Sequence, residues 1–527
     1  MPKEFFITTA IDYTNSAPHI GHAYEKILAD VIARYHRLKG EKVFFLTGVD
    51  QHGQKVQQSA AKAGVPPGEF VKGITQKFVD LWKQLDVQYD AWAATTDPLH
   101  KKCVQEILQR LRDEKRIYKD KQAGYYSVRQ EQFLTDKERG PDGEFGPEWG
   151  EVEFREEENY YFKLSEHKEW LLGYLKNHPD CVAPSFRQTE LINAVEKISG
   201  DLCISRPKSR LNWGIELPFD KDFVNYVWFD ALTNYISFVG YDPKIDNYDK
   251  QSPEFRDKWP ALQIIGKDIL IPAHGIYWMI MLRALGFPDA AMPTFLVHGW
   301  WNLGGAKMSK TAGNVIDPFV LADKYGADAL RYYLIRGTGI RGDADFDENN
   351  LISRFNSDLA NTIGNLLNRT LTMAQRYRNG SVRDVADPLK DKFKAVIDTV
   401  RSKAELTVEA FTFSGDRFEL FLALINVSEL AGRCNEFIEV TKPWDKRCSK
   451  EELDAVIYQL AEALRVLAIL ISPVLPKAAH GIFDQLNWKM ELRGKEERFR
   501  LDDANWGGLP DGHVVGKPVP LFPRIEL

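Results

Sequence analysis

The sequence predicts an α/β protein in which a doubly wound parallel sheet is split by an inserted connective domain and followed by an all-α helix bundle. β-rich runs alternate with helical spacing near the N-terminus and again after residue 260, and a stretch rich in Gly, Pro and acidic residues separates these two parts. After Asp317 the apolar residues recur at helical spacing. A chain of 527 residues is also longer than one hydrophobic core usually organises, so several domains are expected.

The first half of the sheet is predicted from two β-rich runs, residues 5–10 (FFITTA) and 43–49 (VFFLTGV). Between them, residues 22–39 place apolar side chains at helical spacing, which completes a strand–helix–strand unit. Further helices are predicted near 69–85 and 98–113. Such a unit is the building block of a doubly wound parallel sheet.

Residues 118–225 are predicted to form the insertion, because the run ERGPDGEFGPEWGEVEFREEEN interrupts the α/β rhythm. The second half of the sheet is predicted from strands at 263–266 and 295–298, joined by a helix at 276–285. Helices are then expected at 318–335, 353–377, 388–411, 416–439 and 450–470. The expected domain limits are 1–117 and 226–316 for the two halves of the sheet domain, 118–225 for the insertion, 317–352 for a connecting region, 353–504 for the helical domain and 505–527 for an extended tail.

Composition is typical of a folded, water-soluble enzyme, with 44% hydrophobic and 27% charged residues. The net charge of −6 requires any nucleic-acid binding to come from local basic faces. The N-terminus does not resemble a signal peptide, and no apolar run is long enough to span a bilayer. The five cysteines form no C-x-x-C pair, so we expect a cytoplasmic protein without disulfides.

The first motif with chemical content is Pro18-His19-Ile20-Gly21-His22, between a predicted strand and a predicted helix. Gly21 permits close backbone approach, and the start of the helix offers N–H groups and a positive dipole end to a phosphate. Histidines near a helix start are equally often capping or structural residues, so this motif alone does not decide the function.

The second motif is Lys307-Met308-Ser309-Lys310, flanked by glycines in GGAKMSKTAGN. Two lysines on a mobile loop can close over a polyphosphate and neutralise the charge that develops on a leaving group. A solvated basic loop would explain this motif equally well if it stood alone. Its occurrence after the first motif, on the opposite half of a divided α/β domain, favours the phosphate interpretation.

Together the motifs resemble the HIGH and KMSK signatures of class I aminoacyl-tRNA synthetases, and the chain is similar to the methionyl-tRNA synthetase family over almost its whole length. The similarity includes ITTAIDYTNSAPHIGH, FLTGVDQHG, YVWFDALTNY, GKDILIPAHGIYW, VHGWWNLGGAKMSKTAGNVIDP and Lys442-Pro443-Trp444. The resemblance implies a Rossmann-type catalytic domain that activates L-methionine with ATP to methionyl-adenylate. It also implies transfer to the 3′-terminal adenosine of tRNA(Met), including initiator tRNA.

The resemblance implies that His19, His22, Lys307 and Lys310 carry the catalysis by stabilising charge on the phosphates. The residues implied to bind ATP are Gly21, His22, His298, Gly299 and Lys310. Mg²⁺ is expected to accompany ATP on the phosphate oxygens.

Methionine has no charged side-chain handle, so its selection must rest on pocket shape and on contacts of its sulfur. The resemblance places Ala10, Ile11, Tyr13, Asp50, Trp228, Ala231, Tyr235, Ile269 and His274 around the amino acid. Asp50 is the carboxylate implied to pair with the substrate ammonium. GKDILIPAHGIYW is one residue longer than the family's usual stretch, which puts the position of His274 in question.

Many members of the family hold zinc in the insertion through cysteine pairs, but the matching positions here are Ser127, Gln130, Gly146 and Trp149. These residues cannot replace a thiolate tetrahedron, so we expect no metal there. Aromatic packing is expected to hold the insertion instead, around Tyr125, Tyr126, Phe133 and Trp149.

In the helical half, Phe355, Leu359, Ile363 and Leu366 share one face of a helical wheel. The polar residues Asn361, Asn365 and Arg369 share another, which could read unstacked bases by hydrogen bonds. The resemblance implies that the tRNA anticodon is read by Asn365, Arg369 and Trp444. A solvated helix face with an incidental tryptophan is the plainer alternative.

Three other functions fit parts of the sequence. Class I synthetases for leucine, isoleucine or valine usually have a larger insertion, and a cysteine enzyme would place metal ligands in its active site. A small-molecule nucleotidylyltransferase would not need the long helical half, and a non-catalytic RNA-binding protein would not need both motifs intact. Because nothing follows Leu527, we expect a monomer without an added C-terminal dimerising module.

Overall fold

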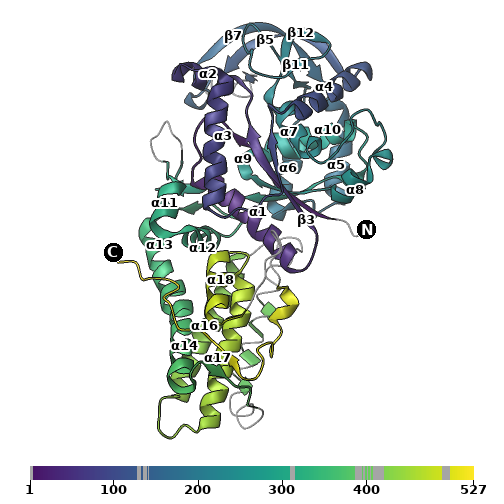
Figure 1. Cartoon of the computed structure of the whole chain (residues 1–527). Helices are drawn as coiled ribbons and strands as arrows, with labels where there is room; N and C mark the ends of the chain where they lie inside the picture. The colour runs from purple at the N-terminus through teal and green to yellow at the C-terminus, as the bar shows by residue number, and fades with distance from the viewer. Residues whose placement is uncertain are drawn as a thin grey trace.

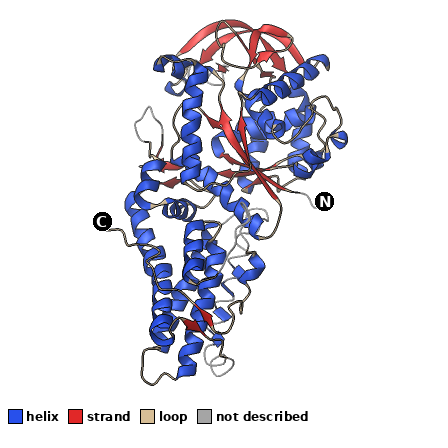
Figure 2. Cartoon of the chain, in the orientation of Figure 1, coloured by secondary structure: helices blue, strands red, loops and turns tan. Residues whose placement is uncertain are grey.

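A computed structural model of the chain describes residues 4–526, except for 128–131, 135–138, 141, 309–314, 489–498 and most of 386–419. An α/β part lies at the top of Figure 1 and a long helical part lies below it. Curved antiparallel strands cover the top of the α/β part, as the red arrows in Figure 2 show. No described helix is long and apolar enough to cross a bilayer.

A single parallel sheet organises the α/β part, in the strand order β2-β3-β1-β13-β14-β8, with β4 also pairing with β3. All of its pairings are parallel. Its strands are β1 (Phe5–Thr9), β2 (Asp12–Tyr13), β3 (Val43–Asp50), β4 (Ala91–Ala94), β8 (Val182–Ala183), β13 (Leu262–Gly266) and β14 (Thr294–His298). The predicted doubly wound sheet is confirmed.

Helices cover both faces of this sheet, as is usual for parallel sheets. Since successive side chains of a strand point to opposite sides, neighbouring residues of one strand pack against different helices. Ile7 packs with α1 and α3, and its neighbour Phe6 packs with α4, α7 and α10. The helices of this part are α1 (Ile20–Leu38), α2 (Gln54–Ala63), α3 (Pro67–Gln84), α4 (Pro98–Asp113), α7 (Val227–Ser237), α8 (Pro253–Lys258), α9 (Lys267–Ile269) and α10 (Met279–Ala284).

Two helix boundaries differ from the sequence prediction. Helix α1 begins at Ile20 rather than residue 22, because the His19 side chain caps it by accepting a hydrogen bond from the Gly21 N–H. The predicted helix 276–285 is preceded by a π-helical segment, η5 (Leu270–Trp278), and continues as α10. Hydrophobic periodicity does not separate π from α geometry at this length.

The insertion contains two antiparallel sheets. One is formed by β5 (Ile117–Ser127), β6 (Gln132–Leu134), β7 (Val152–Phe162) and β9 (Leu202–Cys203), and the other by β10 (Ser205–Pro207), β11 (Glu216–Leu217) and β12 (Asp220–Asn225). The same stretch also holds α5 (Lys168–Asn177), α6 (Ser185–Glu196) and β8, which joins the parallel sheet. The prediction that the α/β rhythm fades over 118–225 therefore missed this return to the central sheet.

The predicted aromatic packing of the insertion is only partly seen. Tyr126 is fully buried between the guanidinium groups of Arg155 and Arg210. Tyr125 is instead 41% exposed and contacts Phe154 on the outer face of the sheet, because neighbours on a strand face opposite sides. Gln130 and the side chain of Phe133 lie outside the described residues, whereas Trp149 is partly buried.

The helical part is built from α11 (Pro318–Tyr325), α12 (Ala327–Gly337), α13 (Glu348–Arg354), the π-helical η7 (Phe355–Gly364), α14 (Asn365–Arg378), α16 (Leu420–Thr441), α17 (Lys450–Ile471) and α18 (Pro476–Gln485). The predicted helix 318–335 is broken at Gly326, whose φ of 87° favours glycine. The predicted helix 353–377 changes to π geometry at Phe355. The predicted helix 388–411, and residues 416–419 of the next one, fall mainly outside the described residues.

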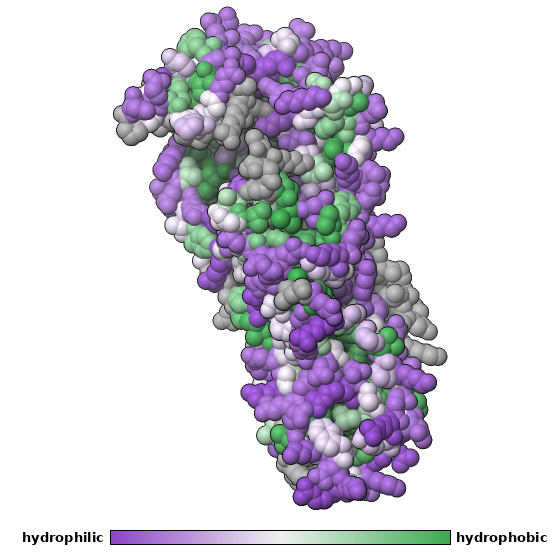
Figure 3. Space-filling view, turned by 90° about the vertical axis from the view of Figure 1, so that its left-hand side faces the viewer, coloured by the Kyte–Doolittle hydropathy of each residue, from purple (hydrophilic) through white to green (hydrophobic). Residues whose placement is uncertain are grey.

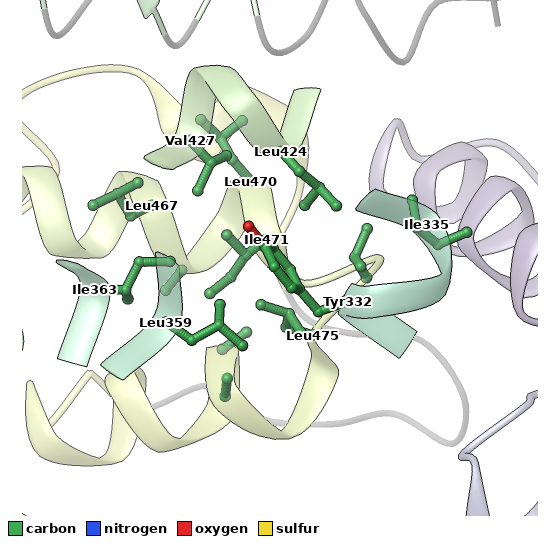
Figure 4. Close-up of a cluster of buried hydrophobic side chains, with 14 of the residues drawn as sticks. Tyr332, Ile335, Leu359, Ile363, Leu424, Val427, Leu467, Leu470, Ile471 and Leu475 are labelled. Carbon is green, nitrogen blue, oxygen red and sulfur yellow. The ribbon is translucent and has the colours of Figure 1, made fainter. Parts of the chain in front are cut away.

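Figure 4 shows a cluster of buried side chains in the core of the helical part. Side chains of α12, such as Tyr332 and Ile335, point into a cluster with Leu359 of η7, Leu424 of α16 and Ile471 of α17. The predicted apolar face of Phe355, Leu359, Ile363 and Leu366 is buried. Helix α12 therefore belongs to the core of the helical part, although it is also in contact with α1 of the sheet domain.

The C-terminal segment returns along the helices. β19 (His513–Val514) pairs with β18 (Ser381–Val382), and the main chain of Ile525 exchanges two hydrogen bonds with the Asn356 side chain. The buried Glu462 carboxylate accepts the N–H groups of residues 507–509. The C-terminal segment is therefore anchored at each of these places.

Candidate active site

A cavity of about 560 Å³ lies at the carboxyl ends of the central strands. Its lining includes Asp50 at the end of β3, Gly266 at the end of β13 and His298 at the end of β14. β1 and β13 are neighbours at the centre of the sheet, and the chain adds further strands outward from β1 on one side and from β13 on the other. Ligands of doubly wound sheets bind at the point where the strand order reverses in this way. Figure 3 shows a hollow in the upper half of the molecule, with hydrophobic residues gathered around it.

Residues from both halves of the sheet domain meet in this cavity. The predicted site residues that line it are Ala10, Ile11, Tyr13, His19, Gly21, His22, Asp50, Trp228, Ala231, Tyr235, Ile269, His274, His298, Gly299 and Lys307. Lys310 lies outside the described residues. The divided sheet domain thus brings the two motifs to one place, although nearly three hundred positions separate them in the sequence.

The two histidines of the first motif are oriented by the start of α1. His19 Nδ1 accepts the Gly21 N–H at 3.1 Å, and His22 Nδ1 accepts the His19 N–H at 3.1 Å. Because each Nδ1 is an acceptor, the proton of each ring is on Nε2. The motif therefore supplies two Nε2–H donors at a helix N-terminus, which suits a phosphate.

Lys307 of the second motif contacts an acidic residue, Asp268, and an aromatic residue, Trp300. Its ammonium lies 3.0 Å from Asp268 Oδ2 and 3.9 Å from the centre of the Trp300 ring. Trp300 Nε1–H donates to Asp268 Oδ1 at 3.2 Å. Burial raises the pKa of Asp268, but the attraction of Lys307 together with the hydrogen bonds from Lys307 and Trp300 outweighs burial and holds this pKa below its usual range.

Asp50 provides a buried carboxylate on the wall of the cavity. Burial raises its pKa well above the usual value, and the negative charge of Asp230 adds to this shift. The His52 N–H donates to Asp50 Oδ1 at 3.4 Å. A carboxylate placed in this way favours a cationic ligand group, because the cation would offset both effects.

Tyr235 and His274 form a polar pair in an otherwise apolar part of the cavity. His274 Nδ1–H donates to the Ile269 carbonyl at 2.8 Å, so the Nε2 lone pair accepts the Tyr235 O–H at 2.8 Å. Burial lowers the pKa of His274 to about 4, and this ring is neutral near pH 7. The one-residue extension of the loop therefore still leaves His274 in the cavity.

A buried ionic network lies beside the first motif, around Lys26 of α1. The Lys26 ammonium uses its three protons on Ala10 O, Asp12 Oδ1 and Glu25 Oε1, at 2.7–2.9 Å. Glu25 Oε2 also lies 3.1 Å from His298 Nε2. Burial raises the pKa of Asp12 to about 7 despite the attraction of Lys26. This network ties β1 and α1 of one half to β14 of the other.

The predicted anticodon residues lie far from the cavity, in the helical part. Asn365 donates to Asn435 Oδ1 at 3.2 Å, and Arg369 pairs with Glu439 at 2.6 Å, so both face α16. Trp444 is 49% exposed between α16 and α17. The three residues therefore gather around one end of α16.

Sequence reasoning missed several groups of the site. Glu25, Asp268 and Trp300 line the cavity, and the last two lie in GKDI and HGWW beside residues that were predicted. A charged residue next to a predicted ligand was the available signal for Asp268. Among the described residues, no group of three or more His, Cys, Asp or Glu side chains could hold a metal ion.

The comparisons with a family model, with known sequences and with solved structures all find the same family. The family model described as tRNA synthetases class I (M) matches residues 5–142 and 149–371. The methionine–tRNA ligase of Caldanaerobacter subterraneus is 40% identical over 535 residues, which cover 100% of this chain and 80% of that protein. The methionine–tRNA ligase of Lactococcus lactis is 38% identical over 539 residues, with coverage of 100% and 78%. The solved structure of Mycobacterium tuberculosis methionyl-tRNA synthetase with methionyl-adenylate has a TM-score of 0.87 and 34% identity, and the match covers 99% of this chain and 100% of that one.

Proposed function

The chain belongs to the methionine–tRNA ligases among the class I tRNA synthetases, and from this membership we propose how its own residues share the work. The enzyme activates methionine with ATP and transfers it to tRNA(Met), initiator tRNA included. The observation that carries the assignment of the site is the meeting of His19, His22 and Lys307 around one cavity that also holds Asp50.

In the first step, a methionine carboxylate oxygen attacks the α-phosphorus of ATP, and pyrophosphate leaves with the bond electrons. No protein nucleophile is needed, so the residues act by position and charge. The Nε2–H groups of His19 and His22 donate to the phosphates. Lys307 and Lys310 neutralise the pyrophosphate as it leaves, and Mg²⁺ that accompanies ATP would add to this neutralisation.

Gly21, Gly299 and His298 surround the nucleotide, where the two glycines allow close backbone approach. Asp50 pairs with the methionine ammonium. The walls formed by Ala10, Ile11, Tyr13, Trp228, Ala231 and Ile269 fit the apolar chain. The Tyr235–His274 pair faces the sulfur, and because His274 accepts the Tyr235 proton, the phenol oxygen can turn only lone pairs to the thioether.

In the second step, the tRNA end reaches the adenylate while the helical part holds the anticodon. Asn365 and Arg369 offer hydrogen bonds to unstacked bases, and the exposed Trp444 ring offers a stacking surface. The domain limits predicted from the sequence serve as the working division of the chain, with residues 317–352 as the contact to the tRNA stem. The predicted cytoplasmic location fits five cysteines that form no disulfide, and a monomer remains part of the proposal.

The insertion is proposed to fold without zinc. Ser127 Oγ donates to the Trp149 carbonyl at 2.5 Å, and this hydrogen bond joins two of the four positions that matched metal ligands by resemblance. One equivalent of zinc per purified chain in metal analysis would contradict the proposal.

The proposed activity is tested by ATP–pyrophosphate exchange with methionine, leucine and cysteine, each in the absence of tRNA. We expect exchange with methionine that exceeds exchange with either of the others by at least about a hundredfold. Preference for leucine or cysteine would identify another class I synthetase. Exchange that needs no amino acid would favour a small-molecule nucleotidylyltransferase.

A further inference from the structure

Asp230 lies behind the methionine wall, at the centre of a buried polar cluster. Its side chain is fully buried, and its two oxygens accept His52 Nδ1–H and His100 Nε2–H, each at 2.7 Å. His100 Nδ1 lies 2.8 Å from Ser237 Oγ. The cluster therefore joins three elements: the turn after β3, helix α4 and helix α7.

None of these four side chains lines the cavity. Helix α7 turns Trp228, Ala231 and Tyr235 toward the cavity and Asp230 away from it. His52 bonds to both Asp50 and Asp230. Its main-chain N–H donates to Asp50, and its ring donates to Asp230. One residue thus connects the proposed ammonium anchor to the helix that carries the side-chain walls.

Resting on the proposed function, we propose that the Asp230–His52–His100 cluster positions α7 against Asp50, and so sets how strictly the enzyme reads the length of the amino acid side chain. The ammonium is fixed at Asp50, and the walls of α7 fix how far the side chain can extend. The distance between Asp50 and α7 therefore determines which length of side chain fits.

The physical reason is that an apolar pocket distinguishes one methylene group only weakly, by roughly 1–3 kcal/mol, and only when its walls do not move. A displacement of about 1 Å at a positioned group can cost on the order of a hundredfold in rate. A buried carboxylate with two charge-assisted hydrogen bonds resists such a displacement, because breaking either bond leaves a buried charge without its partner.

Charge in the cluster supports this role. Burial raises the pKa of Asp230, but His52 and His100 outweigh burial and lower the pKa to about 2, so the carboxylate is ionised. Its negative charge acts together with Asp50 on the region where the ammonium is proposed to bind. The same cluster thus favours a cation at Asp50 while it holds α7 in place.

The test compares Asp230→Asn and His52→Ala with His52→Asn, whose amide N–H can replace the Nδ1–H donor. ATP–pyrophosphate exchange is measured with methionine, with ethionine, which is one methylene longer, and with norleucine, which has the same length but no sulfur. The Asp230→Asn and His52→Ala variants should raise KM for methionine about tenfold and leave KM for ATP within about twofold.

The preference for methionine over ethionine should fall at least about fivefold in these two variants, and the preference over norleucine should change less than about twofold. His52→Asn should recover most of the lost preference. Ser237→Ala, at the far end of the cluster, is a milder variant that should show a smaller change in the same direction.

Equal loss of both preferences, or equal changes in KM for methionine and ATP, would show a general structural defect and overturn the proposal. An unchanged preference over ethionine in a folded variant would also overturn it. Wild-type protein without methionine-dependent exchange would instead contradict the proposed function on which this proposal rests.

Discussion

At the scale of single residues, the first motif works because its backbone fixes which nitrogen of each histidine carries the proton. His22 Nδ1 accepts the His19 N–H, which places the ring proton on Nε2, and His22 lines the cavity. His22→Ala should lower the rate of pyrophosphate exchange by about two to three orders of magnitude, or roughly 3–4 kcal/mol, as expected for losing one preorganised donor. His22→Gln places an amide N–H near the position of Nε2 and should recover part of the rate. A near-normal rate in His22→Ala would refute the assignment.

His274 gives a prediction for pH. Burial lowers its pKa to about 4 from the usual value of 6.5, so between these values the unfolded chain binds a proton that the folded chain refuses. This group therefore makes the folded state less stable as pH falls from about 6.5 to about 4, by at most about 1.4 kcal/mol per pH unit. In urea unfolding at pH 7 and pH 5, His274→Gln should lose less stability on acidification than the wild type. The same loss in both proteins would contradict the burial of a neutral ring.

At the scale of elements, the close pairing of β3 and β4 depends on Gly48. A Cβ at this position would lie 1.9 Å from the carbonyl oxygen of Ala93 on the neighbouring strand. Gly48→Ala should therefore lower the free energy of unfolding by about 3 kcal/mol or more. The matched control is Gly73→Ala in α3, where no atom lies within 4 Å of the added Cβ, and where alanine should stabilise the helix by about 1 kcal/mol. Denaturant unfolding of both variants tests the pair, and equal midpoints would contradict the predicted clash.

The sequence predicted most elements of the sheet domain well because their periodicity is strong and local. The strand at 43–49 and the helix at 98–113 agree with β3 and α4 to within one residue. The two-residue strand β8 was missed, since it has too few residues to show a period and joins the sheet through a long-range pairing. The π geometry of η7 was missed because the same residues face the core in a π-helix and in the predicted α-helix.

Site residues could be predicted from the sequence where they belong to a recognisable motif. Residues that meet only in the folded structure could not be predicted. His19, His22 and Lys307 stand in recognisable motifs, whereas His52 and Asp230 meet across 178 positions of sequence. No local pattern reports such a contact. The Lys26 network was missed although its partners are near in sequence, because Ala10 follows β1 and Asp12 lies in β2, and periodicity does not report contacts between different elements.

At the scale of the whole molecule, the residues that line the cavity belong to the α/β part, whereas the proposed anticodon residues belong to the helical part. Figure 1 shows the helical part below the α/β part. The two parts are joined by buried contacts, among them the ion pair of Arg331 in α12 with Asp30 in α1 at 2.7 Å. Trp444 does not line the cavity, so Trp444→Ala should leave tRNA-independent pyrophosphate exchange unchanged. The same variant should reduce tRNA charging about tenfold or more, because one base loses its stacking partner. Arg447→Ala in the same loop is an exposed control, since among the described residues its ion pair is the local one with Asp445. Equal losses in both assays for Trp444→Ala would indicate a folding defect.

The central claim is that the two halves of the sheet domain converge on one ATP and one methionine. A crystal structure of the chain with methionine and a non-hydrolysable ATP analogue tests it most directly. We expect the triphosphate within hydrogen-bond distance of His19, His22 and the lysines of the second motif, with the methionine ammonium on Asp50. A triphosphate bound away from both histidines, or a methionine whose ammonium avoids Asp50, would contradict the account.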